Sequence, residues 1–329
     1  MIRFGVVGTG WITEAFIKAA SLDERFQLAA VYSRTQARAL DFAEKYSVEH
    51  IFTDLEDMAE SKTVDAVYIA SPNCCHARQA ILFMNHQKHV LCEKPIASNG
   101  KELLAMIESS KTNQVALMEA LKTTVLPNFQ AIRENLPQIG RIRRFLSSKC
   151  QYSSRYDAYK AGEAPNAFNP QLSNGSLMDI GVYCIYPVVA LFGKPDSIEA
   201  SAVFLDSGID GEGSLVLHYP DKEAVISHSK IADSELPSEI QGEGGNIIID
   251  QISTPQKIEI IYRNGLREDI SRNQKDQLMF YEVQEFIHLI ENHQIESQVN
   301  SHLLSLAVME IMDEARKKIG LVFPADHAS

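Results

Sequence analysis

The sequence predicts an α/β protein of two domains. A doubly wound parallel sheet is expected in residues 1–120, followed by an α+β domain with a large open, mainly antiparallel sheet in residues 121–329. Three observations lead to this prediction. The 329 residues are about twice the ~150 residues of a typical domain. Short apolar runs alternate with helix-periodic runs in the first part, and hairpin turn signals replace that alternation in the second.

The alternation in the first part predicts a parallel sheet with helices on both faces. Parallel strands need crossover connections, and these are usually helices. The strand-like runs are Ile2–Val7, Leu28–Tyr32, Ala66–Ala70, Val90–Cys92 and Val115–Met118. The helical runs between them are Trp11–Ser21, Thr35–Tyr46, Cys75–Asn85 and Lys101–Ser110.

The second part begins with a helix-like run at Pro127–Asn135 and continues with hairpin signals at Pro220-Asp221, Gly242–Gly245 and Asn264-Gly265. Asn-Gly is the strongest of these, because a type I′ turn needs positive φ at both central residues. Two apolar-periodic helices, Leu278–Glu291 and Leu303–Lys317, are expected on one face of the sheet. The other face is then expected to be buried by self-association, as a homodimer or a larger homo-oligomer.

Charge and cysteine content narrow the partners and the compartment. There are 31 Lys and Arg against 43 Asp and Glu, a net charge of −12, which disfavours nucleic acid and anionic membranes as partners. The five cysteines form no C-x-x-C pair, so neither a disulfide framework nor a metal site is expected. We therefore expect a cytoplasmic protein without a structural metal.

The turn Gly8-Thr9-Gly10-Trp11-Ile12 lies between the first strand and the first helix, followed by Thr13 where an ideal dinucleotide motif has a third glycine. Gly8 allows a sharp turn, and Gly10 leaves no side chain between the backbone and a pyrophosphate. The helix that follows offers unpaired amide hydrogens to the phosphates. The turn therefore predicts a dinucleotide site.

The end of the second strand indicates which dinucleotide. An NAD site usually has Asp or Glu there for the ribose hydroxyls, whereas this chain has Ser33, Arg34 and, one helical turn later, Arg38. These side chains suit a 2′-phosphate and an adenine face. NADP is expected as the cofactor, with NAD as the alternative.

Further motifs resemble the Gfo/Idh/MocA family of dinucleotide-dependent oxidoreductases, in the branch of glucose-fructose oxidoreductase and dimeric dihydrodiol dehydrogenase. The resemblance rests on the glycine turn together with Ser71-Pro72-Asn73, His76, Glu93-Lys94-Pro95, Met118-Glu119-Ala120 and the segment 174–183. The order and spacing of these motifs cover nearly the whole chain. The resemblance implies a Rossmann domain and a C-terminal domain whose open sheet often makes dimer contacts.

The resemblance also implies roles for single residues in the first domain. Lys94 is the lysine that lies beside the nicotinamide and hydrogen-bonds the reacting oxygen. Glu93 is expected at the cofactor ribose, and Ser71, Asn73 and His76 near the nicotinamide half. His76 also has a simpler interpretation as a residue that starts a helix.

In the second domain the resemblance assigns Asp179 and Tyr183 to catalysis with Lys94. They are i and i+4 on an expected helix, so they would share a face. A nearby ammonium group stabilises a tyrosine phenolate, and Lys94 is the expected neighbour. Tyr183 would then take the proton of a secondary alcohol, and Asp179 would orient the substrate hydroxyl or Lys94.

The resemblance implies an NAD(P)-dependent dehydrogenase or reductase acting on the secondary hydroxyl or carbonyl of a sugar, polyol or dihydrodiol. Two alternatives stay open. One is a regulatory sensor that binds the dinucleotide without turnover. The other is a redox-neutral enzyme with tightly held cofactor, which oxidises its substrate transiently.

Overall fold

The computed structural model describes residues 1–327, and the chain divides into two compact units. Unit 1 comprises Met1–Leu121 and Lys275–His302, and unit 2 comprises Lys122–Gln274 and the chain from Leu303 onward. The first boundary lies one residue beyond the expected residue 120. The return of Lys275–His302 to unit 1 departs from the expectation that all later residues belong to the second domain.

Unit 1 is built on a six-stranded sheet with the strand order β3-β2-β1-β4-β5-β6, and all its strand pairs are parallel. The strands are β1 (Ile2–Val7), β2 (Phe26–Tyr32), β3 (His50–Phe52), β4 (Ala66–Ile69), β5 (His89–Glu93) and β6 (Leu117–Ala120). The order reverses direction between β1 and β4. In doubly wound sheets, ligands bind at the carboxyl ends of the strands beside such a switch point.

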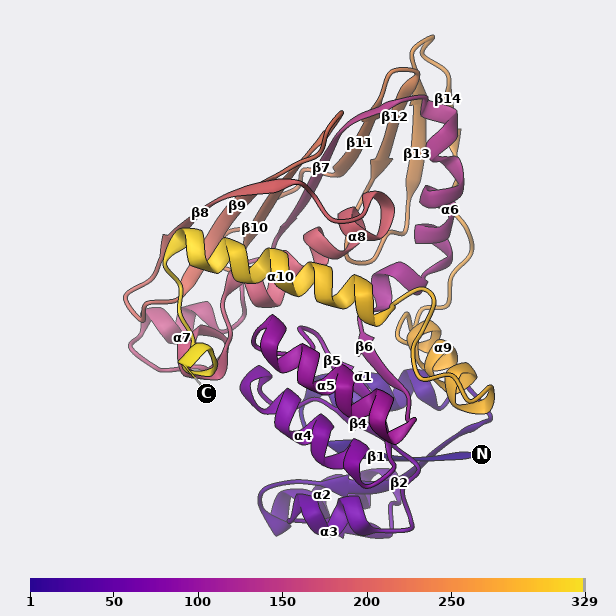
Figure 1. The fold of residues 1–329 in the computed structure, drawn as a ribbon, viewed down its shortest axis with the longest axis vertical. Coiled ribbons are helices and arrows are strands. Elements are labelled where there is room, and N and C mark those ends of the chain that lie inside the picture. Colours follow the sequence, from indigo (N-terminus) through magenta and orange to yellow (C-terminus); the bar gives the residue numbers. More distant parts are fainter. Residues whose placement is uncertain (328–329) are drawn as a thin grey trace. The chain divides into compact units, whose positions relative to one another are not determined.

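Helices cover both faces of this sheet (Figure 1). They are α1 (Trp11–Ala20), α2 (Gln36–Tyr46), α3 (Leu55–Glu60), α4 (Asn73–Asn85), α5 (Gly100–Asn113) and α9 (Phe280–Glu291). On one face, Phe4 of β1 contacts Phe16 of α1 and Phe286 of α9, with ring centroids 6.1 and 6.0 Å apart. Phe16 also stacks on Tyr68 at 3.8 Å. These rings form the core of unit 1.

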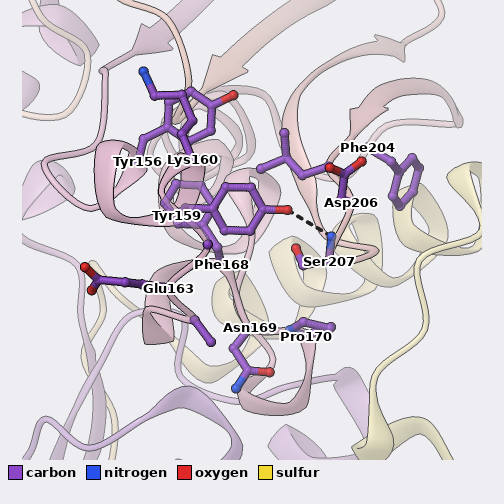
Figure 2. Close-up of a pocket in the computed structure, with 13 residues that line it drawn as sticks. Tyr156, Tyr159, Lys160, Glu163, Phe168, Asn169, Pro170, Phe204, Asp206 and Ser207 are labelled. Atoms are coloured by element: carbon purple, nitrogen blue, oxygen red, sulfur yellow. Dashed lines mark hydrogen bonds between the residues drawn. The ribbon is translucent and has the colours of Figure 1, made fainter.

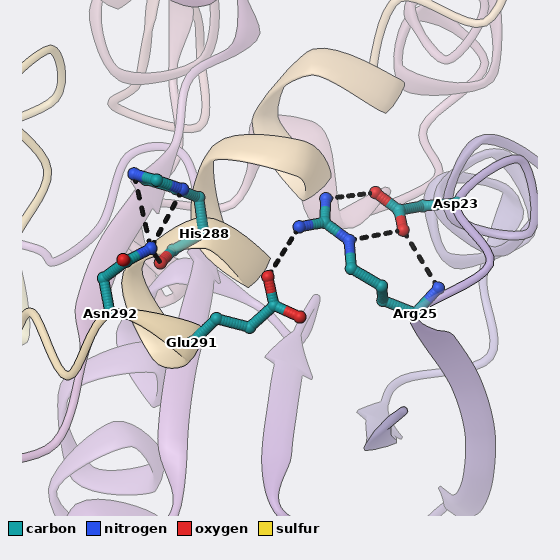
Figure 3. A network of polar contacts seen from close by, with 5 residues as sticks. All are labelled: Asp23, Arg25, His288, Glu291 and Asn292. Atoms are coloured by element: carbon teal, nitrogen blue, oxygen red, sulfur yellow. Dashed lines mark hydrogen bonds and ion pairs between the residues drawn. The ribbon is translucent and has the colours of Figure 1, made fainter.

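Helix α9 is fixed to unit 1 by a polar network as well as by its apolar face. The Arg25 guanidinium lies between two carboxylates (Figure 3), donating to Asp23 at 2.7 Å and to Glu291 at 2.7 Å. It also holds the pKa of Asp23 below its usual value. The expectation that both C-terminal helices cover the second sheet is therefore wrong for α9. Periodicity shows that a helix has an apolar face, but not which sheet that face covers.

Unit 2 contains an eight-stranded sheet with the order β14-β13-β12-β11-β7-β10-β9-β8. Its strands are β7 (Ile142–Cys150), β8 (Ser197–Phe204), β9 (Asp210–His218), β10 (Glu223–Ser229), β11 (Ser238–Gly242), β12 (Gly245–Ile249), β13 (Ile258–Tyr262) and β14 (Arg267–Asp269). The three expected hairpins are present as β9–β10, β11–β12 and β13–β14. The sheet is mainly antiparallel, with one parallel pair, β7 and β10. The expected fold class is therefore confirmed.

One face of this sheet carries the core of unit 2. Its helices are α6 (Pro127–Asn135), α7 (Tyr156–Lys160), α8 (Val182–Phe192) and α10 (His302–Ile319) (Figure 1). Helix α8 packs against β7 and β10, and the Tyr186 hydroxyl, 2.9 Å from that of Ser305, links α8 to α10. Along each strand the side chains alternate between buried and partly exposed, so the opposite face is the more open one. Within residues 1–327, no helix combines the length and apolarity needed to cross a membrane.

Candidate active site

The glycine turn at the end of β1 has the conformation that its sequence predicts. Gly8 has φ +113°, and a Cβ there would lie 2.7 Å from the carbonyl oxygen of Ala70, so no other residue fits without strain. Gly10 precedes α1, and a Cβ added to it would meet nothing within 4 Å. The first amides of a helix have no intrahelical acceptor. The turn therefore presents open backbone donors, which fit a pyrophosphate.

The residues expected at the adenosine end lie after β2. Ser33 is buried, and its amide donates to the Phe52 carbonyl at 3.1 Å, which ties this turn to β3. Arg34 precedes α2 and Arg38 lies in its first turn, and both are exposed. The two guanidinium groups are thus accessible to a ligand. Trp11, at the start of α1, is 75% exposed.

His76 connects the loops that follow β4 and β5. Its Nε2 lies 2.8 Å from the Ser71 carbonyl oxygen and its Nδ1 lies 3.0 Å from that of Pro95. The residue is 1% exposed, and burial lowers its pKa. The Ser71 hydroxyl donates to Gln79 at 2.6 Å, and Asn73 begins α4. These contacts favour a supporting function for His76, between two loops expected at the nicotinamide.

Two buried carboxylates hold the backbone around Lys94. Glu93, the last residue of β5, accepts a hydrogen bond from the Tyr68 hydroxyl and another from the Lys94 amide at 3.2 Å. Glu119 of β6 accepts from the Ile96 amide at 3.0 Å. Lys94 itself is half-buried. The main chain on both sides of the lysine is therefore fixed, and Glu119, which belongs to the Met118-Glu119-Ala120 motif, was not expected in this position.

Asp179 and Tyr183 lie in different helical segments. Asp179 belongs to a π-helical turn, Leu177–Gly181, and Tyr183 lies in the first turn of α8, which follows it. The helix expected here is therefore present, but its part around Asp179 is π-helical rather than α-helical. Single π turns inside helices are frequently found at functional sites. Asp179 pairs with the Lys230 ammonium at 2.9 Å, and the Asp179 side chain is 36% exposed.

Tyr183 has two cationic groups of its own unit near its ring. The Lys122 ammonium is 5.3 Å and the Lys149 ammonium 5.5 Å from the centroid of the Tyr183 ring. Lys149 also donates to the Ser253 hydroxyl at 2.9 Å. Sequence reasoning missed Lys122, Lys149 and Lys230. Lys149, for example, lies on strand β7, and nothing in the sequence around it indicates which aromatic ring it contacts.

Buried polar groups of the sheet support the segment that carries Asp179. His228 Nδ1 lies 2.8 Å from the Ser176 hydroxyl, and Asp210 accepts from the Leu177 amide at 2.6 Å. Burial raises the pKa of Asp210 to about 7. Gly213 is required beside His228, because a Cβ there would lie 2.9 Å from the ring. The start of the π turn is thus attached to β9 and β10.

The buried His228 gives a pH-dependent prediction. Burial lowers its pKa to about 3 from 6.5, so on acidification below about pH 6.5 the unfolded chain binds a proton that the folded chain does not. The contribution of His228 to the free energy of unfolding should therefore fall by about 2 kcal/mol between about pH 7 and about pH 5, while the raised pKa of Asp210 acts in the opposite direction in both the wild-type protein and His228→Asn. In His228→Asn, which keeps a neutral polar group, urea unfolding should show a loss smaller by that amount. An equal loss in both proteins would contradict this assignment.

Unit 2 also contains a pocket of about 820 Å³ (Figure 2). Tyr156, Tyr159 and Phe168 form an aromatic wall, and the Tyr159 hydroxyl accepts from the Ser207 amide at 2.9 Å. The Phe168 ring centroid lies 5.2 Å from the Lys230 ammonium. Phe168 therefore lines the pocket and also contacts Lys230, the residue that pairs with Asp179. No cluster of three His, Cys, Asp or Glu suited to a metal ion occurs in the described chain.

Comparison with known proteins agrees with this geometry. Residues 2–121 match the model described as "Oxidoreductase family, NAD-binding Rossmann fold" and residues 130–248 match the "GFO/IDH/MocA C-terminal domain". The chain is 56% identical over 328 residues to scyllo-inositol 2-dehydrogenase (NADP(+)) of Bacillus subtilis, covering 100% of both chains. It is 32% identical to trans-1,2-dihydrobenzene-1,2-diol dehydrogenase of Danio rerio, covering 99% of both.

Among solved structures, the fold is similar to that of a 3-ketoreductase from Actinomadura kijaniata in complex with NADP. The TM-score is 0.84 at 22% identity, over 98% of this chain and 99% of that one. The fold and the glycine turn, together with the two matching family models, are those of a dinucleotide-binding oxidoreductase with two α/β units. The chain belongs to the Gfo/Idh/MocA oxidoreductase family.

Family membership confirms the expected fold and the expected NAD(P)-dependent oxidoreductase. Both relatives are dehydrogenases by name, in agreement with the expected reaction on CH–OH groups.

Proposed function

We propose that this protein is an NADP-dependent dehydrogenase of scyllo-inositol or a closely related cyclic polyol. The observation that carries the proposal is the 56% identity, over the whole of both chains, to the B. subtilis scyllo-inositol 2-dehydrogenase. Among the sugars, polyols and dihydrodiols that the motifs leave open, this identity supports a cyclitol as the substrate. The retained Lys94, Asp179 and Tyr183 support turnover rather than sensing alone.

Unit 1 supplies the cofactor residues in this proposal. The backbone of Gly8, Thr9, Gly10, Trp11 and Ile12 holds the pyrophosphate. Ser33, Arg34 and Arg38 hold the adenosine 2′-phosphate, and Ser71, Asn73, Glu93 and Lys94 hold the nicotinamide riboside, with His76 fixing their loops. The uncrowded backbone at Gly10 and the exposed guanidinium groups of Arg34 and Arg38 support this assignment. Bound NADP⁺ supplies the acceptor for the hydride that leaves the substrate carbon.

The proton leaves through side chains of this protein. In the direction of oxidation, Tyr183 Oη accepts the proton of the reacting hydroxyl, and the Lys94 ammonium stabilises the negative charge that develops on that oxygen. The ammonium groups of Lys122 and Lys149 lie beside the Tyr183 ring, 5.3 and 5.5 Å from its centroid. The half-exposed Asp179 carboxylate accepts a hydrogen bond from a neighbouring substrate hydroxyl. In reduction, each proton returns along the same path.

A substrate panel tests the proposal. Purified protein is titrated with NADPH and NADH by fluorescence, and then assayed with NADP⁺ against scyllo-inositol, myo-inositol, several aldoses and a dihydrodiol. We expect turnover with scyllo-inositol at the highest kcat/KM. NADPH binding without turnover on the panel would favour a regulatory sensor, and cofactor that copurifies and does not exchange would favour a redox-neutral enzyme. Either outcome would contradict the proposal.

Arg34 decides the cofactor preference in this assignment. Arg34→Ala should weaken NADPH binding more than NADH binding, by about 1 to 3 kcal/mol, because the guanidinium pairs with the extra phosphate. Fluorescence titration with both nucleotides measures the difference. Arg78→Ala, which removes an exposed arginine of the same unit, is the control and should change neither affinity. Equal weakening of both nucleotides by Arg34→Ala would reverse the preference for NADP.

Self-association through the open face of the eight-stranded sheet is part of the proposal. Val216, Val225, Leu146 and Ile248 lie on that face and are partly exposed. Val225 is in register with Leu146 on one side and with Val216 on the other, so these three apolar side chains form a row across β7, β10 and β9, and Glu239 lies between this row and Ile248. A row of this kind is most readily buried by a second copy of the same face. The five free cysteines support the expected cytoplasmic location.

A further inference from the structure

We propose that Lys230 is a positioning residue: its buried ammonium fixes the Asp179 carboxylate and the loop of residues 166–174 in the arrangement that the substrate meets. The inference rests on the proposed function, because it assumes that Asp179 contacts substrate. It assigns a function to a charged side chain that the reaction itself does not use.

The ammonium group has an acceptor for each of its three N–H bonds. Lys230 Nζ lies 2.9 Å from Asp179 Oδ2, 2.9 Å from the Ala167 carbonyl oxygen and 3.3 Å from Asn174 Oδ1. An ammonium group has three donors and no acceptor, so this coordination uses all of them. The Phe168 ring closes the remaining side, with its centroid 5.2 Å away.

The two partners of this ion pair are buried to different extents. The Lys230 side chain is 2% exposed, whereas that of Asp179 is 36% exposed. The cation is therefore enclosed by protein, while the carboxylate also reaches the surface of its unit. A buried ion pair is seldom more stable than apolar packing of the same volume, but breaking it by removal of one partner is costly. We therefore expect this ion pair to orient the Asp179 carboxylate rather than to raise the overall stability of the fold.

The backbone at Lys230 is itself held in place. Its amide donates to the Gly211 carbonyl at 2.9 Å, and its carbonyl accepts from the Ser153 amide at 2.9 Å. The ammonium therefore extends from a fixed point next to β10. The residues that hold the segment 176–179 are therefore Lys230, at Asp179, and His228 and Asp210, which contact Ser176 and Leu177.

A double-mutant cycle tests whether Lys230 acts through Asp179. The variants are Lys230→Met, Asp179→Asn and the double variant of the full chain, assayed for kcat and KM with scyllo-inositol and NADP⁺ and for NADPH affinity. We expect Lys230→Met to lower kcat/KM at least about tenfold, with NADPH affinity within about twofold. In the Asp179→Asn background the same change should cost no more than about twofold, because the two residues act as a unit. Equal costs in both backgrounds would overturn the proposal.

Unfolding measurements keep this test separate from the proposed function. If the wild-type protein does not turn over scyllo-inositol, the urea midpoint is compared across the same four proteins. Lys230→Met should lower the midpoint when Asp179 is present and lower it much less in Asp179→Asn, because only the first takes the paired ammonium away from a charged carboxylate. If Lys230→Met fails to fold while the double variant with Asp179→Asn folds, that result would support the same coupling. If neither the single Lys230→Met variant nor the double variant folds, the proposal would be overturned. Lys194→Met, which breaks the exposed Lys194–Glu310 pair, is the control and should behave alike in both backgrounds.

Discussion

Lys94→Ala should reduce turnover of scyllo-inositol with NADP⁺ by at least about 100-fold while NADPH affinity stays within about tenfold. The lysine follows β5 at the carboxyl edge of the parallel sheet, where ligands of such sheets bind. Its amide is fixed by Glu93 at 3.2 Å, so the main chain should keep its position in the variant. What the substitution removes is the ammonium that we propose stabilises charge on the reacting oxygen.

The Lys94 experiment has a matched control in the same unit. Lys18 is an exposed lysine in the last turn of α1, and Lys18→Ala should leave both kcat and NADPH affinity unchanged. Steady-state kinetics and a fluorescence titration of both variants measure the two quantities. Turnover of Lys94→Ala at the wild-type rate would reject the catalytic assignment. Loss of NADPH binding in parallel with turnover would instead indicate that the lysine mainly holds cofactor.

Tyr183→Phe should lower kcat by about 10²- to 10⁴-fold, the usual contribution of a general acid or base. The phenyl ring that remains can still lie beside Lys122 and Lys149, whose ammonium groups are 5.3 and 5.5 Å from its centroid. The substitution therefore removes the proton acceptor with little other change. KM and the urea midpoint should move much less than kcat, because the hydroxyl works in the transition state more than in substrate binding.

Tyr186→Phe provides the opposite pattern as a control. Tyr186 lies on the same helix, α8, but is fully buried, with its hydroxyl 2.9 Å from that of Ser305. Loss of this hydrogen bond should lower stability, by about 1 kcal/mol, and leave kcat unchanged. Stopped assays and urea unfolding of the two variants separate these effects. A drop in kcat that is equal in both would mean that the Tyr183 result reflects damage to α8 rather than loss of a proton acceptor.

Local patterns predicted most of the architecture. The alternation of strands and helices up to Met118 marks the parallel sheet, because each short apolar run is bounded by turn residues and followed by a helical period. The Asn264-Gly265 turn and the two earlier turn signals place three hairpins correctly. The short β3 and α3 were missed because three and six residues carry too little periodicity to stand out.

Features that depend on distant contacts were not predictable in the same way. Helix α9 completes the aromatic core beside Phe4, across some 280 residues of sequence. The π turn before α8 follows from anchors such as Asp210, which lies 33 residues beyond Leu177. Lys230 lies 51 positions after Asp179 in the sequence, although the two side chains are in contact. One sequence shows which residues can carry charge, but not which of them meet.

The measurement that tests the account most directly is isotope transfer. The protein is incubated with NADP⁺ and scyllo-inositol that carries deuterium on its ring carbons, and the NADPH formed is analysed by mass spectrometry. The account predicts one deuterium per NADPH, formation of the corresponding inosose, and at least about a 100-fold loss of both in Lys94→Ala. Unlabelled NADPH, or deuterium transfer that continues at the wild-type rate in Lys94→Ala, would contradict it.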